Sequence, residues 1–288
     1  MTQYRDLFFN SRDGLKLYAR DYESRESAPV IILIPGLTRN SADFEDLCES
    51  LAAQYRLLAV DLRGRGRSDA DSNPHNYHPG TYAEDIACLL RAAAVESALF
   101  IGTSLGGMVA MTLAASSPGS VKGIVLNDVG PEIDPRGLAR IRSYVVGSRD
   151  INSWREAVEA TREIQEEVLP DLSDSEWEVF TRRLYIEDAE GTPVLNFDPG
   201  ISVLLEAQDP SAEPADLWPL FAGLKGIPLM VIRGEHSDIL SNEIVAKMVA
   251  AHPTLTYLEV QGRGHAPLLN EPGVVPAIKE FLRQIPAT

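Results

Sequence analysis

The chain has 288 residues, of which 44% are hydrophobic and 24% are charged, a composition that supports a buried core and excludes wholesale disorder. Lys and Arg number 26 against 42 Asp and Glu, which gives a formal net charge of −16. This balance argues against a nucleic-acid-binding protein, which needs clustered cations to displace counterions from phosphates. It also argues against docking on anionic lipid, so we expect neither nucleic acid nor a membrane as a partner.

Short apolar segments alternate with helical patterns along the chain. Residues 4–10 and 15–21 flank a turn that contains Asp13-Gly14, which predicts a hairpin. Residues 30–34 are apolar on both faces, as is typical of a strand buried in a parallel sheet. Further strands are predicted at 56–60, 98–101, 121–126, 228–232 and 255–260, and helices at 42–53, 82–94, 105–115, 242–251 and 274–284. The alternation predicts an α/β fold with an eight-stranded, mostly parallel sheet flanked by helices, the first two strands being antiparallel.

The alternation stops between residues 131 and 216. This stretch has helical spacing, no Lys and no convincing strand, and its 20 acidic residues against 8 arginines carry −12 of the net charge. We interpret residues 131–216 as an inserted helical subdomain, and residues 1–130 and 217–288 as the core domain. Six aromatic residues in or near it can line a pocket, although each is more often a packing residue: Trp154, Trp177, Phe180, Tyr185, Phe197 and Trp218.

The cysteines and the lack of long apolar runs indicate the cellular compartment that we expect. Cys48 and Cys88 lie in predicted helices, and two cysteines can form neither a disulfide framework nor a structural zinc site alone. A reducing, cytoplasmic setting fits them best. The first residues contain no apolar run typical of a signal peptide, and no stretch approaches the ~20 apolar residues of a membrane span.

The segment Gly102-Thr103-Ser104-Leu105-Gly106 matches the G-x-S-x-G motif of a nucleophile elbow, with a predicted strand before it and a helix after it. Such a serine adopts strained dihedral angles so that its oxygen projects from the end of the sheet, and the glycines leave room for neighbouring backbone. A phosphate-binding turn is the alternative, but it normally supplies a Lys or a G-x-G-x-x-G pattern, and neither is present. We therefore predict that Ser104 is a nucleophile.

A serine nucleophile needs a general base, and the chain has five histidines. His75 and His78 lie in a loop rich in Pro and Asn, and His252 ends a helix, so loop or cap roles are favoured for these three. His236 follows the seventh predicted strand. His265 leaves the last strand on a loop whose glycines let an imidazole reach a neighbouring strand end, and it is the preferred base.

The base in turn needs a carboxylate that orients it. Asp238 lies several residues past the seventh strand, where a loop can bring it under the imidazole, and it is the preferred acid. Glu235 is the nearest rival, and Asp128, just after the sixth strand, is a second one. The chain order Ser104, Asp238, His265 differs from the orders of the chymotrypsin and subtilisin triads and is the order expected of an α/β-hydrolase.

Taken together, these segments resemble the α/β-hydrolase superfamily over nearly the whole chain, with a helical cap inserted after the sixth strand. The resemblance rests on five segments, which are Ile34-Pro35-Gly36-Leu37, residues 61–69, the elbow around Ser104, residues 233–238 and Gly264-His265-Ala266-Pro267. It implies an oxyanion hole made by the backbone N–H groups of Leu37 and Leu105. It also implies a mainly structural role for the arginines and aspartates of residues 61–69.

Members of the superfamily differ in the residue type of the nucleophile, and this residue indicates the reaction. Haloalkane dehalogenases and soluble epoxide hydrolases attack with an aspartate at this position, so Ser104 argues against both. A serine suits carboxylesterases, lactonases, carbon–carbon hydrolases and cofactor-free perhydrolases. In many carbon–carbon hydrolases a Trp follows the catalytic histidine, whereas Ala266 follows it here. The acidic cap argues against a lipase.

We therefore expect hydrolysis of a small-molecule ester or lactone through an acyl-enzyme, with no metal and no organic cofactor. The acidic cap predicts a neutral substrate. Arg140 and Arg142 are candidates for binding a substrate carboxylate, although a solvated helix face is the favoured explanation for both. The alternative from another class is a ligand-binding protein that keeps the hydrolase scaffold without turnover.

Overall fold

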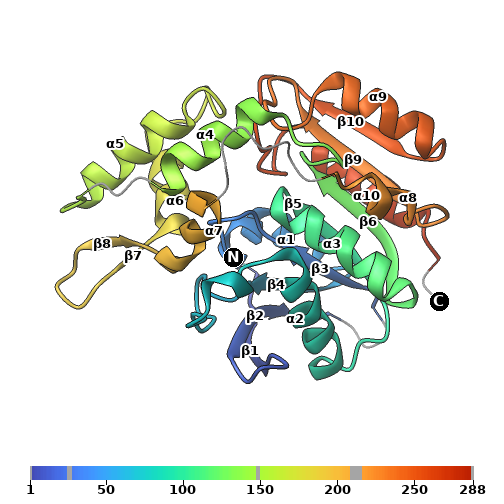
Figure 1. The fold of residues 1–288 in the computed structure, drawn as a ribbon, viewed down its shortest axis with the longest axis horizontal. Coiled ribbons are helices and arrows are strands. Elements are labelled where there is room, and N and C mark those ends of the chain that lie inside the picture. Colours follow the sequence, from blue (N-terminus) through green and yellow to red (C-terminus); the bar gives the residue numbers. More distant parts are fainter. Residues whose placement is uncertain (1, 25–27, 147–149, 208–215, 287–288) are drawn as a thin grey trace.

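A mixed sheet forms the centre of the computed structural model, which describes residues 2–24, 28–146, 150–207 and 216–286 (Figure 1). Its eight strands are arranged in the order β1-β2-β4-β3-β5-β6-β9-β10. The pairs β1–β2 and β2–β4 are antiparallel, and the other neighbouring pairs are parallel, which confirms the predicted sheet. The strands are β1 (Arg5–Asn10), β2 (Lys16–Tyr22), β3 (Val30–Ile34), β4 (Arg56–Asp61), β5 (Ala98–Thr103), β6 (Val121–Asn127), β9 (Leu229–Gly234) and β10 (Thr256–Val260).

Helices cover both faces of this sheet (Figure 1). One face packs against α2 (Pro79–Ala92), α3 (Leu105–Ser116), α8 (Trp218–Ala222) and α9 (Asn242–Ala251), and the other against α1 (Glu45–Leu51) and α10 (Val274–Arg283). The position of β3 between the two helical layers explains why its sequence is apolar throughout. Ile32 and Ile34 belong to the first core and Ile31 and Leu33 to the second, as expected for alternating side chains of a strand buried on both sides. No helix in the described ranges is long and apolar enough to cross a membrane.

Two helix starts differ from the sequence-based prediction. Residues 41–44 form a 3₁₀ turn before α1 begins at Glu45, because the side chain of Asn40 accepts a hydrogen bond from the N–H of Ala42 and tightens this entry. Helix α2 begins at Pro79, with the His78 ring as its N-terminal cap. Pro suits the first helical position since its missing N–H would have no partner there.

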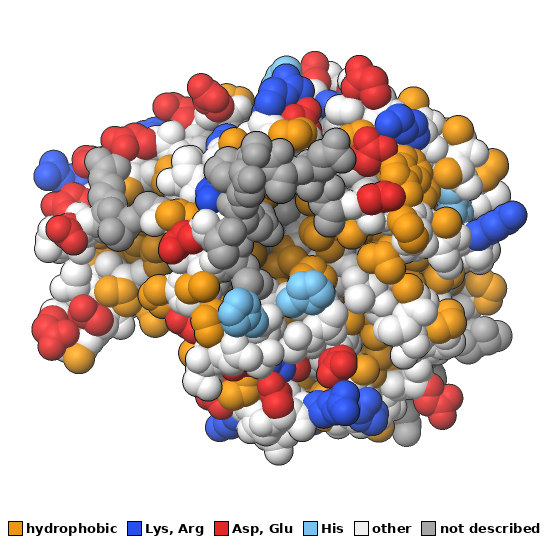
Figure 2. Space-filling model, viewed as in Figure 1, with side chains coloured by type: hydrophobic (Ala, Val, Ile, Leu, Met, Phe, Trp, Pro, Cys, Tyr) orange, Lys and Arg blue, Asp and Glu red, His pale blue; other side chains and the backbone are white. Residues whose placement is uncertain are grey.

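Between β6 and β9 the chain leaves the sheet and forms the insertion, residues 131–216, of which 147–149 and 208–215 lie outside the described residues. Figure 1 shows it to the left of the sheet, and Figure 2 shows Asp and Glu side chains scattered over that part of the surface. Its helices are α4 (Pro135–Val145), α5 (Trp154–Gln165), α6 (Asp174–Leu184) and α7 (Ser202–Ala207).

The insertion also contains two strands, so the expectation that it has none is wrong. Strands β7 (Tyr185–Glu187) and β8 (Pro193–Leu195) form an antiparallel hairpin. In the turn between them, the Asp188 side chain accepts hydrogen bonds from the N–H groups of Glu190 and Thr192 at 3.0 and 2.8 Å. Each strand has only three residues, which is too short for an alternating pattern to be recognised in the sequence.

The sheet order defines where a ligand can bind. Strands β3 and β5 are neighbours, and the chain visits β4 on the far side of β3 between them. The loops that leave β3 and β5 therefore diverge. In open α/β sheets a crevice for ligands lies at such a point, outside the carboxyl ends of the strands. Gly36 follows β3 and Ser104 follows β5 at this edge.

We predict that Gly106→Ala destabilises the protein, because a Cβ at Gly106 would overlap with the backbone of Ile34 and Pro35. Forcing atoms into such a close approach costs about 1–3 kcal/mol. Urea unfolding should show a lower midpoint for this variant. Gly119→Ala is the matched control, since nothing lies within 4 Å of its Cβ position. Equal midpoints for the two variants would contradict the close packing of strand and helix at this turn.

Candidate active site

The turn between β5 and α3 holds Ser104 in an unusual backbone conformation. Its φ and ψ are 52° and −115°, a region that side chains rarely adopt and that the surroundings must enforce. Gly102 and Gly106 make this possible, because a Cβ on either would overlap with neighbouring backbone. The N–H of Ser104 donates to the Asn127 carbonyl at 2.9 Å. The serine side chain therefore projects from the carboxyl end of the sheet, as the motif predicts.

The imidazole of His265 lies between Ser104 and a carboxylate. Its Nε2 is 2.9 Å from Ser104 Oγ, and its Nδ1 is 2.7 Å from Asp128 Oδ2. A carboxylate can only accept, so the proton lies on Nδ1 and the lone pair of Nε2 faces the serine hydroxyl. This tautomer allows the imidazole to take a proton from Ser104.

Asp128 is buried, and its carboxylate is held on every side. It follows β6 directly, and its side chain has no exposed surface. The N–H of Gly234 donates to Oδ1 at 2.8 Å, and the hydroxyl of Ser237 donates to Oδ2 at 2.7 Å, in addition to the contact with His265. Buried charge is tolerated only when it is compensated in this way. Three donors thus fix the carboxylate against the imidazole.

Asp238 does not contact the imidazole, which corrects its predicted position. Its carboxylate accepts hydrogen bonds from Nε and Nη2 of Arg140, on α4, at 2.6 and 2.9 Å. The loop after β9 explains this arrangement, since Ser237 faces Asp128 and the next side chain faces the insertion. Burial alone would raise the pKa of Asp238, but the hydrogen bonds and charge of Arg140 outweigh it and lower the pKa below its usual value.

The remaining candidate acid and bases lie elsewhere. Glu235 accepts a hydrogen bond from the N–H of Gly262 at 2.8 Å. The side chain of His236 is 60% exposed, and its nearest charged partner is Glu235 at 3.7 Å. His252 is buried against backbone carbonyls at the end of α9, in the structural role expected of it.

Sequence analysis missed the residues that hold the loops of Asp128 and His265. Nothing in the sequence singles out Ser237 or the Gly234 amide as partners of Asp128. Asn127 is another such residue, because its Nδ2 donates to the Pro267 carbonyl at 2.9 Å and so ties β6 to the loop of His265. In the sequence, Asp128 is favoured by its position directly after a buried parallel strand. This signal is not specific, because the loop after β9 carries the carboxylates of Glu235 and Asp238 as well.

The two residues of the predicted oxyanion hole lie beside Ser104. Leu105 is the first residue of α3, and Leu37 follows β3 and lines the same cavity as Ser104. Arg65 anchors the Leu37 loop, because its Nε donates to the Leu37 carbonyl at 2.8 Å. Arg63 is 1% exposed and binds Asp13, Asp71 and Asp85. Both arginines thus hold loops in place, in agreement with the structural role that the resemblance implies.

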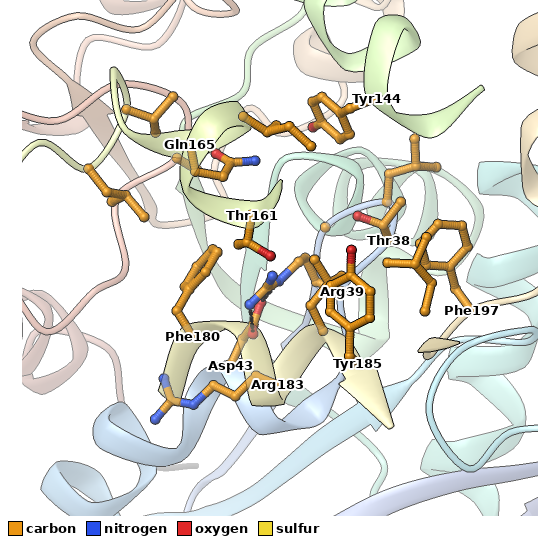
Figure 3. Close-up of a pocket in the computed structure, with 18 of the residues that line it drawn as sticks. Thr38, Arg39, Asp43, Tyr144, Thr161, Gln165, Phe180, Arg183, Tyr185 and Phe197 are labelled. Carbon is orange, nitrogen blue, oxygen red and sulfur yellow. Dashed lines mark hydrogen bonds and ion pairs between the residues drawn. The ribbon is translucent and has the colours of Figure 1, made fainter. Parts of the chain in front are cut away.

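A cavity of about 620 Å³ opens at Ser104 and His265, between the sheet edge and the insertion (Figure 3). Three of the six candidate aromatic residues line it, namely Phe180, Tyr185 and Phe197. Trp177 is buried among apolar side chains of the insertion, whereas the indoles of Trp154 and Trp218 donate to Glu187 and Glu132.

Polar side chains also reach the cavity. Figure 3 shows Thr38, Thr161, Gln165 and Tyr144 around it, and burial raises the pKa of Tyr144. The predicted carboxylate-binding arginines are not among the lining residues, since Arg140 binds Asp238 and Arg142 donates to the backbone of Glu206. Among the described residues, no group of three or more His, Cys, Asp or Glu side chains could hold a metal ion.

Comparison with known proteins gives matches along most of the chain. A family model for the alpha/beta hydrolase fold matches residues 29–272. A 3-hydroxybutyrate-oligomer hydrolase from Cupriavidus necator is 30% identical over 259 residues, covering 88% of this chain and 87% of the relative. A 2-(acetamidomethylene)succinate hydrolase from Mesorhizobium japonicum is 29% identical over 260 residues, covering 90% of each. The crystal structure of an alpha/beta hydrolase from Novosphingobium aromaticivorans superposes with a TM-score of 0.92 at 41% identity, covering 99% of this chain and 100% of that one.

The Arg140–Asp238 pair should contribute stability that depends on pH. Because the pKa of Asp238 is lowered in the folded protein, the contribution is present above the unfolded-state pKa and is lost as the pH falls through the folded value. We expect Asp238→Asn to cost about 1 kcal/mol at pH 7, and the difference from wild type to shrink between about pH 5 and pH 3. Urea unfolding across this range measures it. Arg12→Gln removes a cation that is 80% exposed and lies far from Asp238 in the sequence, and it should have no such effect. A pH-independent cost of Asp238→Asn would contradict the prediction.

Proposed function

The chain belongs to the alpha/beta hydrolase fold family, and from this premise we propose that it is a serine hydrolase that cleaves a small-molecule ester or lactone through an acyl-enzyme. The observation that carries the proposal is the chain of contacts from Ser104 Oγ through His265 to Asp128, at the base of the cavity. Nucleophile, base and orienting acid within hydrogen-bond reach are what acyl transfer requires.

The first half-reaction forms the acyl-enzyme. Ser104 Oγ attacks the ester carbonyl carbon while His265 Nε2 takes the hydroxyl proton. The carbonyl oxygen becomes an oxyanion, which the N–H groups of Leu37 and Leu105 stabilise; losing one such donor typically costs ~3–4 kcal/mol. His265 then donates its proton to the leaving alcohol, and the bond between the carbonyl carbon and the alcohol oxygen breaks.

The second half-reaction regenerates the enzyme. His265 takes a proton from a water molecule, whose oxygen attacks the acyl-enzyme, and Ser104 leaves as the alcohol when the imidazole returns that proton. Asp128 acts in both steps by holding the imidazole tautomer and by balancing the positive charge that the ring acquires. Asp238 has no part in this scheme, since its carboxylate is committed to Arg140.

The insertion acts as a cap in this proposal. Its helices α5 and α6 contribute Thr161, Gln165 and Phe180 to the cavity, opposite the sheet edge that carries Ser104. Covering one side of the site reduces the contact of the nucleophile with water, which strengthens the oxyanion contacts. The relative from Cupriavidus necator supports an ester, because ester bonds join the units of a hydroxy-acid oligomer.

Covalent labelling separates a serine hydrolase from a ligand-binding protein on the same scaffold. We expect a fluorophosphonate probe to label the wild-type protein at Ser104, because the probe reacts only with an activated serine. Labelling should disappear in Ser104→Ala, and intact-protein mass spectrometry measures both. If the wild type stays unlabelled while small esters raise its melting temperature, the enzyme proposal fails.

The two aspartates provide a matched test of the acid. Asp128→Asn should lower kcat for p-nitrophenyl esters by about 10⁴-fold, because the amide no longer selects the productive imidazole tautomer. Asp238→Asn removes a contact with α4 only, so we expect kcat to fall by less than about tenfold. Steady-state kinetics on the two purified variants measures this difference. Equal losses, or a larger loss for Asp238→Asn, would move the catalytic acid to Asp238.

A further inference from the structure

The cavity contains one cation that the proposed mechanism does not use. Among the described residues that line it, the Arg and Lys side chains are Arg39 and Arg183. Arg183 points away from the centre of the cavity in Figure 3, and its Nη2 lies 3.5 Å from Glu45 and 3.2 Å from Asp46. Arg39 lies in the middle of the same view, between Phe180 and Tyr185. Of these two described residues, Arg39 is thus the cation that reaches the inside of the cavity.

Asp43 holds the guanidinium of Arg39 along one edge. Arg39 Nε and Nη2 donate to the Asp43 carboxylate at 2.7 and 2.6 Å, and the Phe180 ring covers one face of the guanidinium at 4.1 Å. A guanidinium carries more N–H groups than one carboxylate can accept. No described residue accepts a hydrogen bond from Arg39 Nη1, so this second edge is available to a ligand in the cavity.

The position of this edge is already set before a ligand arrives. The Arg39 side chain is 15% exposed, and its backbone N–H donates to the Gly36 carbonyl at 3.2 Å, which closes the turn after β3. Chelation by Asp43 fixes the rotamer. Binding of an acceptor to the second edge therefore requires little further loss of conformational entropy in the protein. The planar guanidinium also matches the shape of a carboxylate.

Arg39 and His265 lie on opposite sides of the nucleophile. A Cβ on Gly36 would be 3.7 Å from Arg39 Cγ and 3.9 Å from Ser104 Cβ, so the arginine stem and the serine flank one glycine. In the sheet order, β3 lies on one side of β5, and β6, β9 and β10 lie on the other, with Asp128 and the loop of His265. Because His265 must reach the leaving alcohol, a bound ester that places its alcohol at His265 can extend its acyl group toward Arg39.

We propose that Arg39 binds a carboxylate at the far end of the acyl group, so that the substrate is a half-ester of a dicarboxylic acid. This inference rests on the proposed ester hydrolysis and names its substrate class. It replaces the neutral substrate that the net charge of the insertion predicts. Figure 2 shows Asp and Glu side chains on the outer surface of the insertion, where solvent screens them. Arg39 acts at contact distance inside the cavity, which Asp43 and Asp150 also line and where screening is weak.

Matched pairs of esters test the proposal. The mono-p-nitrophenyl esters of glutaric and adipic acid carry the carboxylate, and their methyl-capped counterparts lack the charge at the same length. After subtraction of the enzyme-free rate, we expect wild-type kcat/KM to favour the carboxylate ester by about tenfold or more for at least one length, because a charge-assisted hydrogen bond is gained.

Two substitutions distinguish binding from a structural role. Arg39→Gln should bring the ratio of the two esters to about one, mainly through a higher KM for the carboxylate ester. Asp43→Asn should lower the ratio without bringing it to one, because the guanidinium keeps its charge but loses the contact that fixes its rotamer. A purely structural role of the pair would lower kcat/KM for both esters alike and leave the ratio unchanged. Arg136→Gln, which removes an exposed arginine outside the cavity, is the control and should match the wild type.

The outcomes separate this inference from the proposed function. If the wild type hydrolyses both esters of each pair equally well, or if Arg39→Gln keeps the wild-type ratio, the carboxylate site is wrong and the ester hydrolase stands. If neither ester is hydrolysed and the fluorophosphonate probe does not label Ser104, the proposed function itself fails. Far-UV circular dichroism of each variant establishes that it is folded.

Discussion

The buried carboxylate of Asp128 is the contact on which the site depends. It follows β6, accepts from Gly234 and Ser237 after β9, and accepts from His265 after β10. One charged group therefore ties three loops together at the carboxyl edge of the sheet. Because a buried charge tolerates the loss of a partner poorly, these loops are held in one arrangement, and the imidazole is oriented toward Ser104 as a consequence.

A second set of buried charges fixes the other side of the nucleophile. Arg65 donates to the carbonyl of Leu37, and the Asp61 carboxylate accepts from the N–H groups of Ser41 and Arg67. The loop after β3 is thereby joined to the loop after β4. Backbone amides can stabilise an oxyanion only when they are preorganised, so this network supports the role proposed for Leu37.

The insertion is attached to the core at the same loops that carry the site. Arg140 binds Asp238 beside Ser237, the N–H of Gly264 donates to the Val168 carbonyl at 2.9 Å, and Arg263 forms an ion pair with Asp171. Movement of the insertion would therefore displace the loops that carry Ser237, the partner of Asp128, and His265. Many of its acidic side chains lie on the outer surface (Figure 2), while its described cavity face is mainly apolar and uncharged polar, with Asp150 and Arg183 as its charged residues.

The sequence by itself determined the sheet, its two helical layers and the elbow of Ser104. Those features depend on local spacing, since a strand such as β3 is apolar throughout when both its faces are buried, and the elbow needs glycines at set distances from the serine. The short hairpin of β7 and β8 gave no such pattern. Only the tertiary structure decided which of Asp128 and Asp238 contacts His265, because both follow parallel strands and both can reach the same edge. This outcome depends on Gly234 and Ser237, which lie 106 and 109 residues from Asp128 in sequence, and on Arg140, which lies 98 residues from Asp238. These contacts form only when the strands and the insertion have packed.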